Sequence, residues 1–339
     1  MCETPLPIAT AEAIRKRLES LAKPVGSLGR LERLAARLAE TQATLTPVSR
    51  PRHMLLFAGD HGVVEAGVGI WPSEVTAAMI ALIGSGRASS SALARASGTT
   101  LGLIDVGSRV QPAPEHAAEH IGQGTRNLAH EPAMTPAEFH AAWDIGAASA
   151  RRAAVSGCRV LGLGEMGIGN TTSAACLTAL VTGCSAEQAT GPGAGATAAT
   201  LDRKRRVVAD AVARARALWP LDPVAALASV SGFEIAAMAG AIARARQLGL
   251  TVILDGYVTG AAALTAFVID PYSMGTAIAA HRSAEPGHAL ALAHLGLEPY
   301  LEWDLRLGEG TGALLLMPLL DAAAALLTEV ATLAEVTGQ

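Results

Sequence analysis

The sequence is poor in aromatic residues and in cysteines. Phe, Trp and Tyr make up 3% of its 339 residues, so few rings could stack on a substrate. It has four cysteines, which form no C-x-x-C pair: Cys2, Cys158, Cys176 and Cys184. Isolated cysteines in a chain of this size are typical of reduced thiols. We therefore expect a cytoplasmic protein.

The sequence also lacks a large excess of charge and a long apolar run. Its 26 Lys and Arg against 30 Asp and Glu give a net charge of −4, and the one basic run, Arg203–Arg206, is too short for a nucleic-acid interface. The most apolar stretch, Ala313–Leu320, contains Pro318 and ends at Asp321. A membrane span needs about 20 apolar residues, so we expect none. Met1–Thr4 lacks the charged start and apolar core of a signal peptide, so we expect no such peptide.

Both ends of the chain have helical periodicity. Ala11–Ala22 and Leu28–Gln42 carry apolar residues at helical spacing, and the intervening Lys23–Ser27 has turn residues. The segment from Thr311 to the end is also predicted to be helical. We expect residues 1–48 and 320–339 to form a small helical domain beside a large α/β domain over residues 49–319.

The middle of the chain alternates short apolar runs with Ala-rich helical stretches. This pattern predicts an α/β fold with a doubly wound, mostly parallel sheet of about six strands. Four strands are expected at His53–Ala58, Leu101–Val106, Arg159–Leu163 and Thr251–Leu254, with weaker candidates at Ala226–Val230 and Met274–Ala279. Ligands of such sheets bind at the carboxyl ends of the strands, where this sequence places its polar motifs.

The first motif is Gly164–Thr172, which follows a predicted strand and opens a helix at Ser173–Thr182. Backbone N–H groups at a helix start form a phosphate site. Gly162, Gly164 and Gly167 also match G-x-G-x-x-G, a pattern of dinucleotide-binding oxidoreductases. That match is weak, because no strand ending in an acidic residue follows about 20 residues later. A purely structural role for the glycines is the other alternative, and Glu165 argues against it.

The second motif is Leu305–Ala313, in which Glu309 stands among glycines just before a very apolar helix. A Glu at a helix start is ordinarily only a partner of the helix dipole. Flanking glycines would let another molecule approach closely, and apolar surroundings would raise the pKa of the carboxyl. Glu309 is therefore predicted to be a general base.

Three further motifs contain candidate binding groups. Thr190–Gly195 with Lys204 could complete a phosphate site, and Ser283 could cap the next helix and add a phosphate donor. His281 and His288 are too far apart on a helix to share a metal, so we expect no zinc. The Asp60-His61 pair could catalyse or could hold a loop, and the role of Asp255 is open in the same way.

Taken in order, these motifs resemble the nicotinate-nucleotide:dimethylbenzimidazole phosphoribosyltransferase family. The matching stretches span nearly the whole chain: Lys23–Glu32, Gly59–Gly62, Gly164–Thr172, Asp255–Tyr257 with Ala261–Leu264, and Arg306–Gly312. One departure lies at Ser85–Ser89, where the family usually has a Gly-Gly-Ala-Ala-Ile-like run.

The resemblance implies a Rossmann-like large domain, a homodimer and roles for particular residues. Glu309 would be the general base and Glu165 a second carboxylate near the reacting centre. The nucleotide phosphate would be held by Gly167, Ile168, Gly169, Asn170, Thr171, Lys204, Ser283 and Gly310. The base pocket would include Pro72, Glu74, Met166 and Leu307.

The implied reaction moves ribose 5-phosphate from nicotinate mononucleotide to a benzimidazole base, for the lower ligand of a cobamide. The leaving pyridine departs as a neutral ring and the donor carries no pyrophosphate, so we expect neither a metal nor a cofactor. Two alternatives are a nicotinamide-dependent oxidoreductase and a non-catalytic binding protein. Within the family, the acceptor could be adenine, a substituted benzimidazole or a phenol.

Overall fold

Five parallel strands form the single sheet of the computed structural model, which describes residues 9–110, 118–193 and 195–338. The strand order is β2-β1-β3-β4-β5, with β1 (Arg52–Gly59), β2 (Thr100–Gly107), β3 (Val160–Met166), β4 (Thr251–Leu254) and β5 (Ala277–Ala279). This is a doubly wound order, in which the connections reverse direction between β1 and β3. Met1–Thr4 lies outside the described residues.

The side chains of β1 show how the two faces of the sheet are covered. Leu55 and Phe57 enter one apolar core, while Met54, Leu56 and Ala58 enter the other. Successive residues of a strand point to opposite faces, so a continuous apolar run such as this one needs helices on both sides. The predicted α/β class with a Rossmann-like parallel sheet is confirmed.

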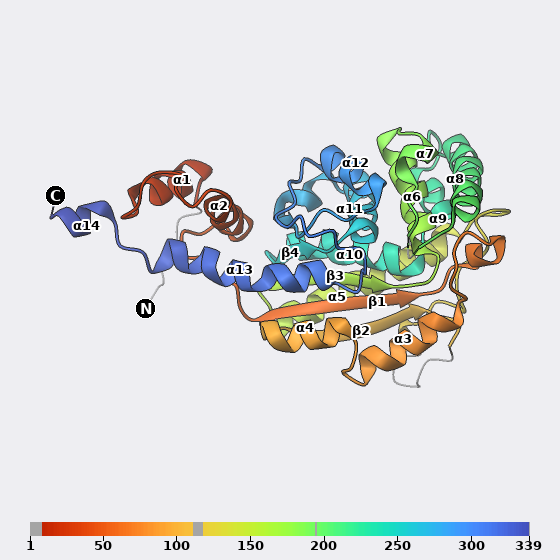
Figure 1. Cartoon of the computed structure of the whole chain (residues 1–339), viewed down its shortest axis with the longest axis horizontal. Helices are drawn as coiled ribbons and strands as arrows, with labels where there is room; N and C mark the ends of the chain where they lie inside the picture. Colours follow the sequence, from red (N-terminus) through yellow and green to blue (C-terminus); the bar gives the residue numbers. More distant parts are fainter. Residues whose placement is uncertain (1–8, 111–117, 194, 339) are drawn as a thin grey trace.

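Eight helices pack on the face of Leu55 and Phe57 (Figure 1). They are α5 (Pro136–Val155), α6 (Asn170–Thr182), α7 (Ala186–Ala189), α8 (Ala198–Leu218), α9 (Pro223–Val230), α10 (Phe233–Gln247), α11 (Tyr257–Ile269) and α12 (Pro286–Leu295). Two 3₁₀ helices, η1 (Gly62–Ala66) and η3 (Pro271–Thr276), complete the connections.

The opposite face is covered by helices from both ends of the chain and by the two helices between β1 and β2. The first group is α1 (Ala11–Ser20), α2 (Arg30–Gln42) and α13 (Thr311–Thr328), and the second is α3 (Glu74–Gly84) and α4 (Ser89–Ser97). Figure 1 shows α13 running from the strands to α1 and α2, with the short α14 (Leu333–Thr337) beyond it. Arg17 of α1 donates to the carbonyls of Leu327 and Val330, at 2.9 and 3.1 Å, and so ties the two chain ends together.

Two of the six expected strands differ from the structure. Ala226–Val230 lies in α9, because Asp222 caps the N–H of Ala225 at 2.9 Å and Pro223 occupies the first turn. An apolar run of this length does not by itself distinguish a strand from a buried helix. Met274–Ala279 is split between η3 and the three-residue β5.

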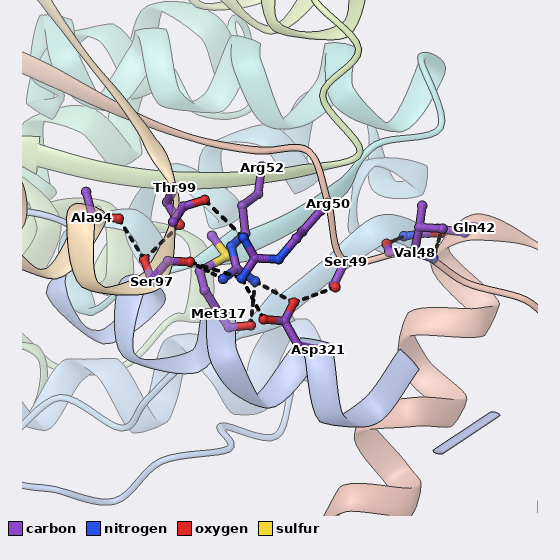
Figure 2. Close-up of polar contacts among 11 residues, drawn as sticks. Gln42, Val48, Ser49, Arg50, Arg52, Ala94, Ser97, Thr99, Met317 and Asp321 are labelled. Carbon is purple, nitrogen blue, oxygen red and sulfur yellow. Dashed lines mark hydrogen bonds and ion pairs between the residues drawn. The ribbon is translucent and has the colours of Figure 1, made fainter. Parts of the chain in front are cut away.

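A polar cluster at the amino end of β1 fixes α13 and α4 (Figure 2). The buried guanidinium of Arg52 donates to the Met317 carbonyl and to Asp321 of α13, each at 2.8 Å, and to the carbonyl of Ser97 at the end of α4. Arg50 reaches Asp321 from a half-exposed position, at 2.9 Å. One side chain of β1 thus holds two helices that lead to the opposite edge of the sheet.

Helix α13 is more continuous than the sequence suggested. It runs through Pro318 and Asp321, and by length and composition it could cross a membrane, with a mean hydropathy of 1.7. However, 56% of that window is buried inside the fold, against α2, α4 and β3. A core helix has the same composition, so α13 is weak evidence for a membrane span.

Candidate active site

A cleft opens at the carboxyl ends of β3, β4 and β5, beside the point where the sheet connections reverse. It encloses about 1000 Å³ of empty space, its open mouth included. Among the predicted site residues, those that line it are Glu165, Met166, Gly167, Ile168, Gly169, Asn170, Thr171, Lys204, Ser283 and Leu307. The structure therefore brings together residues that are up to 142 positions apart in the sequence, from Glu165 to Leu307, as expected for the edge of a parallel sheet.

The first turn of α6 and Lys204 of α8 form one end of this cleft. The Lys204 ammonium donates to the Thr171 hydroxyl at 2.8 Å and to the Gly191 carbonyl at 3.1 Å. Burial lowers the pKa of Lys204 to about 8, although the nearby Glu285 opposes this shift. A buried cation beside a helix N-terminus is suited to binding a phosphate.

Glu285 binds the glycine loop that begins at Thr190, at the same end of the cleft. It accepts the N–H of Gly193 at 2.8 Å, and among the described residues its second oxygen has no hydrogen-bond partner. Ala194 of the loop lies outside the described residues. The N-cap of α12 is Glu285 and not Ser283 as predicted; the Ser283 hydroxyl only accepts the Glu285 N–H, at 3.4 Å.

Glu165 lies at the end of β3 and is 9% exposed. Burial raises its pKa to about 8, and the negative charges of Asp255, Glu234 and Glu309 act in the same direction. The Asn170 amide donates a hydrogen bond to one of its oxygens, and its other oxygen lies against Gly308, where a Cβ would approach to 2.3 Å. Glu165 is therefore largely protonated at neutral pH.

Glu309 lies on a backbone elbow in which Gly308, Glu309 and Gly310 all have left-handed conformations, with φ of 81°, 56° and 71°. Its carboxylate accepts a hydrogen bond from the hydroxyl of Ser90 in α4, at 3.2 Å. Burial raises the pKa of Glu309, the bonds from Ser90 oppose this shift, and the charge of Asp255 adds to it. Ser90 follows directly on Ser85–Ser89. The segment that departs from the family pattern therefore leads into α4, whose Ser90 binds Glu309.

Asp60 and His61 hold loops and helices in place. Asp60 accepts the Arg109 N–H at 2.8 Å. His61 is fully buried between Glu234 of α10, at 2.8 Å, and the Ser173 hydroxyl of α6, at 3.1 Å. These three hydrogen-bonded side chains resemble a Ser-His-Glu triad, but none of them lines the cleft. Glu234 was not predicted from the sequence, because it lies in an ordinary Ala-rich helix.

Four predicted residues do not line the cleft, although the lining residue Gly308 directly precedes two of them, Glu309 and Gly310. Pro72 and Glu74 are exposed near the start of α3 and do not line the cleft. The N–H of Gly310 is donated to Asp255 at 3.1 Å. The binding roles of these residues stay predictions.

The dinucleotide pattern is not realised. Gly162 and Gly164 lie within β3, where side chains would collide with Met54 and with the backbone of Gly310. They therefore serve close packing and cannot form the phosphate turn of that motif. Within residues 9–110, 118–193 and 195–338, no three His, Cys, Asp or Glu side chains converge as a metal site would require.

Comparisons with known proteins agree on one family. A family model described as phosphoribosyltransferase matches residues 4–337. The chain is 45% identical to the nicotinate-nucleotide–dimethylbenzimidazole phosphoribosyltransferase of Cupriavidus taiwanensis, covering 97% of this chain and 95% of that protein. It is 44% identical to the enzyme of the same name from Pseudomonas putida, over 98% and 95%. The crystal structure of the Thermus thermophilus enzyme, also of this name, superposes with a TM-score of 0.90 at 41% identity, covering 97% of this chain and 98% of that one.

Proposed function

The chain belongs to the nicotinate-nucleotide–dimethylbenzimidazole phosphoribosyltransferase family, and from that membership we propose that the cleft is its active site and Glu309 its general base. The enzyme transfers ribose 5-phosphate from nicotinate mononucleotide to 5,6-dimethylbenzimidazole, giving α-ribazole 5-phosphate and nicotinate. Its product supplies the lower ligand of cobalamin. The observation that supports Glu309 most directly is a buried carboxylate held on a glycine elbow next to the cleft.

One carboxylate is sufficient for this reaction. The bond from the sugar C1′ to the pyridinium nitrogen breaks, and its electron pair neutralises the ring, so nicotinate leaves without an acid. The unprotonated nitrogen of the benzimidazole attacks C1′, while its other nitrogen loses a proton to Glu309. A carboxylate whose pKa is raised toward neutrality is better matched to this task than an exposed one.

The phosphate of the nucleotide is assigned to the end of the cleft formed by α6 and Lys204. Gly167, Ile168, Gly169, Asn170 and Thr171 would surround it, with Lys204 and Ser283 as side-chain donors. The Ile168 N–H is donated to the Thr76 hydroxyl at 3.2 Å, so this residue would border the phosphate without donating its N–H to it. Glu165, protonated at neutral pH, can stand near the anionic nucleotide without repelling it.

For the base, Met166 and Leu307 supply apolar surface at the cleft, and Pro72 and Glu74 are kept as lower-ranking candidates. The acceptor in the names of the relatives is dimethylbenzimidazole, and a related base is compatible with so small a set of apolar residues. Competition between dimethylbenzimidazole, adenine and a phenol in one assay would rank them.

We also propose that the chain ends form a small helical domain and that two chains pair in the cytoplasm. Residues 1–48 and 320–339 are joined by the bonds of Arg17 and by a bridge between Leu21 and Thr332. The proposed boundary at residue 320 falls inside α13, so the helix connects both parts. The thiols of Cys158 and Cys176 are buried, and burial raises their pKa to about 11 and 12, which suits unreactive core thiols.

The test is Glu309→Gln, assayed without metal by chromatographic detection of nicotinate and the riboside phosphate. We expect kcat to fall by about 10²- to 10⁴-fold, the usual contribution of a general base, with little change in KM for the nucleotide. Glu298→Gln, at an exposed glutamate on the surface, is the matched control. Equal losses in kcat and in nucleotide affinity would show that Glu309 is not the base.

A further inference from the structure

We propose that Asp255 is a positioning residue for the transfer: its carboxylate fixes the Gly308–Gly310 elbow and thereby aims Glu309 at the acceptor base. The inference rests on the proposed role of Glu309 as general base. Asp255 follows β4 directly and is 2% exposed, whereas Glu309 comes 54 residues later in the chain. No sequence motif links the two.

Asp255 binds the start of α13 through three backbone N–H groups. One carboxylate oxygen accepts from Gly312 at 2.7 Å and from Ala313 at 3.2 Å, and the other accepts from Gly310 at 3.1 Å. The N-cap residue of this helix, Gly310, has no side chain that could do so. A carboxylate from another strand therefore takes over the capping of the helix that follows Glu309.

The elbow requires such an external hold because its backbone is intrinsically unfavourable. Glu309 has φ of 56°, a conformation that residues other than glycine seldom adopt, and such strain persists only where the surroundings enforce it. Thr311 provides a second restraint on the elbow, because its hydroxyl donates a hydrogen bond to the Gly308 carbonyl at 2.8 Å. Together they hold both sides of Glu309.

Asp255 is packed tightly on the side of α13, although Asp255 and His281 also line the cleft. A Cβ at Gly312 would lie 2.9 Å from the Asp255 carboxylate and 2.1 Å from the His281 ring. His281 approaches the same carboxylate with its Nε2 at 3.6 Å, and within the described chain its Nδ1 has no hydrogen-bond partner. Only glycine at position 312 therefore leaves enough space for the Asp255 carboxylate to reach the backbone of α13.

Asp255 also acts on Glu309 through its charge. Asp255 after β4 acts on Glu309, and His281 after β5 acts on Asp255. Glu165 of β3 is affected by both carboxylates and by Glu234 of α10. Burial is the main cause that raises the pKa of Glu309, and the negative charge of Asp255 raises it further. Removing that charge should lower the pKa of the base while leaving its burial unchanged.

The experiment compares Asp255→Asn and Asp255→Ala with the wild type over a range of pH. Asn keeps one oxygen, which can still accept from Gly312 and Ala313, but it loses the acceptor for the Gly310 N–H and the negative charge. The acid limb of the pH profile of kcat should therefore move to lower pH. Ala removes the acceptor, so kcat should fall by at least about 50-fold with KM for the nucleotide changing less than about 3-fold. Thr311→Val should lower kcat without moving the acid limb.

Asp222 provides the matched control, because it caps α9 in the same way, through the N–H of Ala225 at 2.9 Å, from an exposed position outside the cleft. Asp222→Asn and Asp222→Ala should change neither kcat nor its acid limb. If Asp255→Ala does not fold, the acid limb of the pH profile of kcat for Asp255→Asn tests the inference about Asp255 by itself.

Glu309→Gln, measured in parallel, separates the two possible failures. If it lowers kcat while Asp255→Asn leaves the acid limb and kcat unchanged, the inference about Asp255 is wrong and the general base stands. If the Asp255 variants lose nucleotide affinity instead of kcat, Asp255 is a ligand-binding residue and the inference is overturned. Normal kcat in Glu309→Gln would refute the proposed base itself.

Discussion

At the scale of single residues, Glu165 is the clearest case of a group that the fold holds in its neutral form. Its pKa is raised from 4.5 to about 8 by burial and by three neighbouring carboxylates. The folded state therefore binds its proton more tightly than the unfolded state does. The free energy of unfolding should fall as pH rises from about 4.5 to about 8, because in this range the unfolded state is stabilised by releasing the proton of Glu165 and the folded state retains it.

Glu165→Gln, which is neutral at every pH, should abolish this dependence. One pKa unit corresponds to about 1.4 kcal/mol, so the variant should gain up to about 5 kcal/mol over the wild type between pH 5 and pH 9. Urea unfolding at several pH values measures the difference. Glu187→Gln, at an exposed glutamate of α7, is the control and should run parallel to the wild type. A constant difference between Glu165→Gln and the wild type would contradict the raised pKa.

The sequence indicated some site residues far better than others. Glu165 and Glu309 stood out because charged residues beside glycines are unusual in an apolar chain, whereas Lys204, within a short basic run, was indicated only together with the glycine loop before it. Glu234 and the capping role of Asp255 could not be inferred, because their partners His61 and Gly312 are remote in sequence. Only the packing of α10 and α13 against the sheet brings these pairs together.

At the scale of elements, the strands were predictable where burial on both faces produced a long apolar run, as in β1 and β3. The error at Ala226–Val230 came from ranking an apolar run above its start signal, since Asp222-Pro223 is a typical helix beginning. The three-residue β5 is an edge strand, and it is a strand mainly because it pairs with β4. Such pairing is a tertiary property that a local pattern does not carry.

The position of helix α13 depends on the hydrogen bonds of Arg52 to Met317, Asp321 and Ser97, here called the Arg52 clamp (Figure 2). Arg52→Met should lower the free energy of unfolding by about 3–5 kcal/mol, because buried carbonyls of Met317 and Ser97 lose their partner and Asp321 loses a buried cation. Arg50→Met removes a half-exposed partner of the same Asp321 and should cost about 0–1 kcal/mol. Chemical denaturation of the three proteins is the measurement. Similar losses in both variants would show that the clamp acts only through surface charge.

At the scale of the whole molecule, the fold follows from the alternation of apolar strands and helices, and its ligand site from the parallel sheet. The sequence predicted a small helical domain made from both chain ends, but it could not reveal the contacts between them, such as the bonds of Arg17 to Leu327 and Val330. Figure 1 shows α1, α2 and α14 gathered at one end of the molecule. This end exposes five large apolar side chains, here named the apolar end patch, which are 40–69% exposed: Val25, Leu28, Leu319, Leu333 and Val336.

The apolar end patch is the surface on which we expect the second chain of the proposed homodimer to dock. Large apolar side chains exposed on one part of a surface often mark an interface, and a stable interface buries about 800 Å² on each partner. The double variant Val25→Glu with Val336→Glu places charges at two of its most exposed positions and should weaken the dimer at least about 10-fold, since each buried charge costs more than 1 kcal/mol. Light scattering over a dilution series measures the mass. Leu221→Glu alters an equally apolar residue that is 88% exposed in the connection between α8 and α9, and it should leave the dimer intact. A wild-type monomer would refute the dimer, and a dimer unaffected by the double variant would place the interface on another surface.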